Sequence, residues 1–84
     1  MNWLMVVIFA TLAGDVYIFY TPKFESREAC IQSVMDPQDQ KKYVRKLFLE
    51  YGQRMPIHAV NCLPEDKIKQ ILQEYNGEVK GNET

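Results

Sequence analysis

The chain has 84 residues, of which 46% are apolar and 25% are charged, a composition that fits one small globular domain and excludes a disordered chain. Its net charge of −1 excludes a global field that would attract nucleic acid or an anionic membrane. We expect a single domain over residues 1–76. A flexible tail is expected over 77–84, because Val79 is the one large apolar residue there.

The first twenty residues contain one charged side chain, Asp15, and three interpretations compete for them. The uncharged run Trp3–Ala13 has the length of a signal-peptide core, but no Lys or Arg precedes it. Trp3–Tyr20 approaches the length of about 20 apolar residues that a membrane helix needs. Asp15 would then lie inside the membrane, where a carboxylate is costly.

The third interpretation is a β-hairpin, and it is the one we prefer. Gly14-Asp15 separates two runs rich in β-branched and aromatic residues, which suits a two-residue turn. Strands are expected over 3–11 and 16–21, and Pro22 should end the second because it lacks a backbone N–H. This interpretation explains Asp15 and Pro22 together.

Beyond Pro22 the apolar residues recur at the spacing of an α-helix. Ser26 predicts the cap of a first helix, and Asp36 followed by Pro37 predicts the start of a second that ends at Gly52. The second helix has one apolar stripe: Tyr43, Val44, Leu47, Phe48 and Tyr51.

A short strand is expected over 57–62, and a third helix should start at Leu63-Pro64-Glu65-Asp66 and end at Asn76-Gly77. Its expected buried stripe is Ile68, Ile71, Leu72 and Tyr75. The predicted fold is therefore α+β with the order β-β-α-α-β-α and with the helices packed on one face of a small sheet. The first strand should be central, with the third strand parallel to it on one side.

A two-residue turn pairs odd positions of the first strand with even positions of the second. One face would then carry Leu4, Val6, Ile8, Ala10, Tyr17 and Phe19. The opposite face mixes aromatic rings and Met, a composition typical of protein interfaces. Either this face binds a second copy or a target protein, or the last helix covers it. The candidate interaction face consists of Trp3, Met5, Val7, Phe9, Ile18 and Tyr20.

Cys30 and Cys62 fall on elements that should be neighbours, so they form either a disulfide or two buried thiols. With His58 they offer three soft ligands, but without the close spacing of a zinc site. No nucleophile motif, phosphate-binding glycine loop or paired carboxylates accompany them. We therefore expect no enzyme activity, no metal and no cofactor.

A weak basic ridge on the second helix consists of Lys41, Lys42, Arg45 and Lys46. Phosphate contacts from these side chains would make binding to nucleic acid salt-dependent. A solvated helix face has the same composition, and nearby acidic residues dilute the charge. Nucleic acid is therefore not the partner that we expect.

Two short segments, Phe24-Glu25-Ser26-Arg27-Glu28-Ala29-Cys30 and Asn61-Cys62-Leu63-Pro64-Glu65, resemble parts of small accessory proteins encoded by tailed bacteriophages. The resemblance implies no catalytic residues. It implies expression inside a bacterial host cell and binding to a host factor. In a bacterial cytosol the two cysteines would stay reduced.

These observations predict a small non-enzymatic interaction module in the cytoplasm of a bacterial host cell. Its expected partner is itself, as a homodimer, or a host protein. The alternative is a membrane-anchored or exported small protein that uses residues 1–20 as its anchor or signal.

Overall fold

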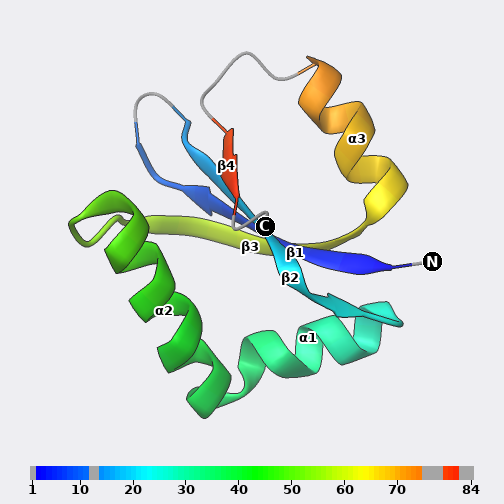
Figure 1. The fold of residues 1–84 in the computed structure, drawn as a ribbon, viewed down its shortest axis with the longest axis horizontal. Helices are drawn as coiled ribbons and strands as arrows, with labels where there is room; N and C mark the ends of the chain where they lie inside the picture. Colours follow the sequence, from blue (N-terminus) through cyan, green and yellow to red (C-terminus); the bar gives the residue numbers. More distant parts are fainter. Residues whose placement is uncertain (1, 12–13, 75–78, 82–84) are drawn as a thin grey trace.

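The computed structural model describes residues 2–11, 14–74 and 79–81, which form an α+β fold built on one four-stranded mixed sheet (Figure 1). The α+β class and the predicted order are confirmed, with one strand added at the end. The strands are β1 (Trp3–Phe9), β2 (Val16–Phe24), β3 (Ile57–Pro64) and β4 (Val79–Gly81), in the sheet order β3-β1-β2-β4. The helices are α1 (Arg27–Met35), α2 (Pro37–Tyr51) and α3 (Glu65–Glu74).

The N-terminal hairpin is confirmed, but its turn is wider than the predicted two residues. The Phe9 N–H donates to the Asp15 carbonyl at 3.0 Å, so the reversal lies between these residues. Thr11 closes it, because its hydroxyl donates to the Asp15 carboxylate at 3.1 Å and accepts from the Asp15 N–H at 3.2 Å. Gly14 adopts a φ of 68°, which glycine tolerates without steric cost.

The wider turn changes which residues of β1 and β2 share a face. Met5 pairs with Phe19 and Val7 with Tyr17, so odd positions oppose odd positions. The predicted odd-to-even pairing is therefore wrong. Because side chains alternate along a strand, this one-residue difference exchanges the two faces of β2 relative to β1.

β2 also extends past the expected end at Thr21. Trp3 pairs with Phe24, and the register shifts between Trp3 and Met5. Pro22 falls within this irregular stretch, where no ladder N–H is needed from it, so it does not end the strand.

β1 is central as predicted, but β3 runs antiparallel to it, not parallel. β2 ends beside Trp3, whereas β3 begins beside Phe9, at the other end of β1. The helices α1 and α2 therefore carry the chain from the Trp3 end of β1 to its Phe9 end. β3 starts at that end and must run antiparallel to β1.

β4 corrects the prediction of a flexible tail over 77–84. Val79 pairs with Val16 and Gly81 with Ile18, and β4 runs parallel to β2 at the edge of the sheet. Residues 77–78 and 82–84 lie outside the described residues.

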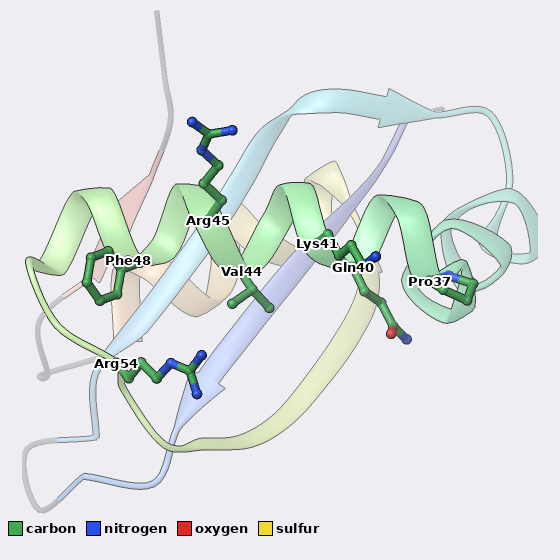
Figure 2. Close-up of a pocket in the computed structure, with 7 residues that line it drawn as sticks. All are labelled: Pro37, Gln40, Lys41, Val44, Arg45, Phe48 and Arg54. Carbon is green, nitrogen blue, oxygen red and sulfur yellow. The ribbon is translucent and has the colours of Figure 1, made fainter.

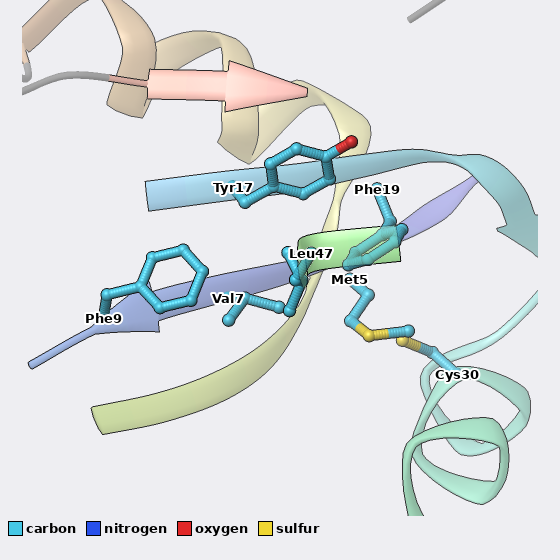
Figure 3. Packing of buried hydrophobic residues seen from close by; sticks show 7 residues of the cluster. All are labelled: Met5, Val7, Phe9, Tyr17, Phe19, Cys30 and Leu47. Atoms are coloured by element: carbon cyan, nitrogen blue, oxygen red, sulfur yellow. The ribbon is translucent and has the colours of Figure 1, made fainter. Parts of the chain in front are cut away.

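The helices cover both faces of the sheet, so the prediction of helices on one face is wrong. α1 and α2 lie on one side and α3 on the other (Figure 1). The core is accordingly divided in two. The cluster under α1 and α2 is shown in Figure 3 and contains Met5, Val7, Phe9, Tyr17, Phe19, Cys30 and Leu47. The cluster under α3 contains Leu4, Val6, Val16, Ile18 and Ile68.

The predicted caps of the first two helices are confirmed, whereas the predicted end of the third at Asn76-Gly77 lies outside the described residues. The Ser26 hydroxyl accepts from the Ala29 N–H at 3.1 Å, and the Asp36 carboxylate accepts from the Gln38 N–H at 2.8 Å. Pro37 occupies the first turn of α2, and Gly52 ends it in the left-handed conformation at a φ of 70°.

The apolar stripes of the helices are only partly buried. On α3, Ile68 is buried while Ile71 and Leu72 are 37% and 38% exposed, and Tyr75 lies outside the described residues. On α2, Leu47 is buried, but Val44 and Phe48 are exposed.

Candidate interaction surfaces

The residues of the predicted interaction face do not form a common surface. Met5, Val7 and Phe9 are buried under α1 and α2. Ile18 lies on the opposite face of the sheet, against Ile68. Trp3 packs at the margin of the first cluster and Tyr20 at the margin of the second. The prediction is wrong because it depended on the two-residue turn, and the wider turn separates these residues.

Cys30 and Cys62 form a disulfide that ties α1 to β3, with their Cα atoms 6.0 Å apart. Cys30 is completely buried beside Met5 (Figure 3). In this oxidised state neither sulfur is a thiolate, so neither can act as a nucleophile or a metal ligand. His58, on the same strand, has an exposed side chain. Among the described residues, no three His, Cys, Asp or Glu side chains gather as metal ligands would.

The pKa of Tyr17 departs clearly from its ordinary value. Burial, together with the negative charge of Glu50, raises the pKa of Tyr17 to about 12. Its hydroxyl oxygen is buried, and the Glu50 carboxylate lies near enough to influence it although no hydrogen bond of good geometry joins the two. The phenol therefore stays protonated at neutral pH and offers no general base.

The four residues of the basic ridge are all exposed on α2, but they do not act as one patch. Lys46 forms an ion pair with Glu50 at 3.3 Å, so its charge is partly compensated. Lys41 and Arg45 line an open groove on α2, whereas Lys42 and Lys46 do not. The structure thus divides the predicted ridge between a groove and ordinary surface.

The groove, which we call the α2 groove, is lined by seven residues and has a volume of about 550 Å³. Figure 2 shows Val44 and Phe48 along the helix, with Arg45 extending from one side and Arg54 from the loop on the other. Sequence reasoning missed Arg54, because only the reversal of the chain at Gly52 brings it back against α2. The lining residues are Pro37, Gln40, Lys41, Val44, Arg45, Phe48 and Arg54.

The second candidate surface is the outer edge of β3, because β3 is the last strand of the sheet on its side. Its eight residues include no Asp, Glu, Lys or Arg. The Glu65 N–H donates to the Asn2 carbonyl at 2.9 Å. Since hydrogen-bonded pairs alternate along an antiparallel ladder, the main-chain groups of Val60 and Cys62 point outward.

Hollows flank this edge on both faces of the sheet. On the α1 side, a hollow beside residues 60–64 is lined by the apolar Trp3, Ile31 and Val34 and by two cations, Arg27 and Lys67. On the α3 side, Ile71 and Leu72 line another beside Asn61 and Leu63. The second hollow continues under α3 to Val16, Ile18 and Val79, so it lies between that helix and the sheet.

Comparisons with known proteins add no assignment. No protein-family model matches this chain, and no curated protein or solved structure matches it. Within the described part of the chain, no helix combines the length and the apolar character needed to cross a bilayer.

Proposed function

We propose that the protein is a non-enzymatic interaction module that forms a homodimer through the free edge of β3. The observation that carries this proposal is an eight-residue edge strand without a charged side chain. Monomeric proteins usually protect such edges with charges, prolines or covering segments, because an open edge pairs readily with another chain. In β3 the proline, Pro64, is the last residue and leaves the centre of the strand unprotected.

The register of the strand fits a symmetric dimer. A two-fold axis beside Asn61 places Val60 of each copy opposite Cys62 of the other, where their outward main-chain groups exchange hydrogen bonds. Asn61 then faces its own copy, and its exposed amide can both donate and accept a hydrogen bond. The interaction joins two sheets of four strands into one continuous sheet.

The resemblance to phage accessory proteins supports a role inside a bacterial host cell. We propose that the module also contacts a host protein there. The disulfide supports the alternative location, because such bonds persist mainly in oxidising compartments. Use of residues 1–20 as an anchor or signal would remove β1, the central strand, from the sheet. We therefore propose a structural role for these residues.

The charge substitution Asn61→Lys tests the dimer. It places two like charges opposite each other at the proposed two-fold axis, where such pairs are destabilising. We expect the wild type to sediment as a dimer and Asn61→Lys as a monomer, in analytical ultracentrifugation over a concentration series.

The matched control is Leu49→Lys, which adds the same charge at a 70% exposed position on α2. This variant should remain dimeric. A monomeric wild type, or a dimer that persists in Asn61→Lys, would contradict self-association through β3.

A further inference from the structure

We propose that the α2 groove is a second binding site, which takes an acidic amphipathic helix of a partner protein. This site lies on α2 beside the start of β3, where Val44 and Phe48 share hollows with Ile57, and the proposal does not rest on the dimer. The proposal follows from three features of the groove: its exposed apolar floor, its uncompensated positive rim and its length.

The floor of the groove consists of apolar side chains that the described chain leaves about half exposed. Val44 is 49% exposed and Phe48 is 47% exposed, although both belong to the apolar stripe of α2. They lie four residues apart and therefore on one side of the helix, as Figure 2 shows. Leu47, between them in the sequence, is buried against the sheet. The apolar stripe of α2 is thus wider than the core can use, which leaves a strip for a partner.

The rim of the groove is positive. Lys41, Arg45 and Arg54 line it, and no acidic residue is among its seven lining residues. Among the described residues, none of the three cations has a carboxylate within ion-pair distance, in contrast to Lys46, which is paired with Glu50. The remainder of the chain offsets these charges, since the net charge is −1. A local positive rim in a slightly acidic protein selects a negatively charged partner at this site.

The length of the groove fits a helix. Pro37 and Phe48 mark its two ends, which corresponds to roughly 16 Å along α2 at about 1.5 Å per residue. A partner helix of three turns can place apolar residues at i, i+3 or i+4, and i+7 on Val44 and Phe48. Its flanking Glu or Asp side chains would then reach Arg45 on one side and Arg54 on the other.

Other negatively charged partners fit the groove less well. Single-stranded nucleic acid binds through aromatic rings on which successive bases stack, and Phe48 is the one aromatic residue that lines the groove. An anionic membrane would require a broad basic face, but Lys46, the cation of α2 next to the groove, is paired with Glu50. Both remain outcomes of the experiment.

The probe is a fluorescein-labelled peptide of sixteen residues, with Leu at i, i+3, i+4 and i+7 and Glu at the flanking positions. A scrambled peptide of the same composition, a dT16 oligonucleotide and phosphatidylglycerol vesicles serve as competing ligands. We expect fluorescence anisotropy to report saturable binding of the amphipathic peptide and at least about tenfold weaker binding of the scrambled one. Equal binding of the two peptides, or preferential binding of dT16 or the vesicles, overturns the proposal.

Two variants with matched controls locate the binding on the groove. Phe48→Ser should weaken peptide binding about thirtyfold, whereas Leu49→Ser, next to it but outside the groove, should leave binding unchanged. Arg45→Glu should weaken binding about tenfold and reduce its salt dependence, whereas Lys42→Glu on the same helix should have little effect.

The expected result requires that all four variants keep the wild-type circular dichroism spectrum and melting temperature, as substitution of exposed residues should permit. Binding should also be retained in monomeric Asn61→Lys, which separates this site from the dimer. If Phe48→Ser and Leu49→Ser bind equally well, the groove is not the binding site.

Discussion

The two faces of the sheet are covered by different kinds of side chain. Under α1 and α2 the core is rich in aromatic rings. The ring centroids of Tyr17 and Phe19 are 4.9 Å apart in an edge-to-face contact, and those of Phe19 and Tyr43 of α2 are 5.1 Å apart. The disulfide fixes α1 to β3 on the same side. Under α3 the core is aliphatic, and Ile68 is the one buried residue among those described in that helix.

This difference indicates where the stability of the domain is concentrated. The side with α1 and α2 combines ring contacts, a cross-link and two capped helices, so its loss should unfold the chain as a whole. The side with α3 depends on one anchoring residue and on the half-exposed Ile71 and Leu72. We expect α3 to open locally while the rest of the domain remains folded.

The largest loss of stability is expected for Phe19→Ala, on the side of the sheet that α1 and α2 cover. Phe19 is almost completely buried and touches rings from both the sheet and α2. Truncation should lower the free energy of unfolding by about 3–5 kcal/mol, measured by urea denaturation. All spectroscopic probes should lose signal at a common, lower midpoint. A loss below about 1 kcal/mol would show that the aromatic side does not dominate.

Removal of the disulfide should have the next largest effect. The bond joins residues separated by 32 positions, and opening a loop of this size should lower the free energy of unfolding by about 3–4 kcal/mol. Urea denaturation of wild type before and after reduction by dithiothreitol measures this difference. The double variant Cys30→Ala, Cys62→Ala provides the control, because it should show the low stability regardless of dithiothreitol. Equal stability of oxidised and reduced wild type would contradict the role of the cross-link.

The smallest effect is expected for Ile68→Ala on the side of α3. It should lower the stability of α3 by about 2 kcal/mol, since the loosely covered helix can settle into the space left behind. Native-state hydrogen exchange should show faster exchange of the amides in α3, while those of β1 keep their protection. If Ile68→Ala instead accelerates exchange in both elements equally, the two faces form one cooperative unit.

Much of the fold could be predicted from local patterns. Ser26, Asp36-Pro37 and Gly52 marked the helix ends correctly, because a cap depends on residues within one turn of it. The central position of β1 followed from its apolar character on both sides. The proximity of Cys30 and Cys62 followed from the expected adjacency of their elements.

The candidate site could not be predicted, because it depends on distances along the chain that local patterns do not set. The proposed face was built on one assumption about the turn at Gly14, and the hydrogen bonds of Thr11 with Asp15 produced a different register. The α2 groove required Arg54 to return to the helix after Gly52. The edge position of β3 depended on where β2 and β4 pair.

The first twenty residues show which properties the sequence determines and which the tertiary structure determines. By itself the sequence determined that Met1 to Tyr20 would be apolar, interrupted at Gly14-Asp15, and compatible with two strands, because these properties are intrinsic to the residues. Only the tertiary structure decided that both faces of the hairpin are buried, one by α1 and α2 and the other by α3. The physical reason is that burial depends on which surfaces remain to cover a strand, and those surfaces come from helices outside the hairpin, of which α3 begins more than forty residues beyond it. The exposed large apolar side chains described by the structure therefore lie on the three helices and at Ile57 of β3, not on the hairpin.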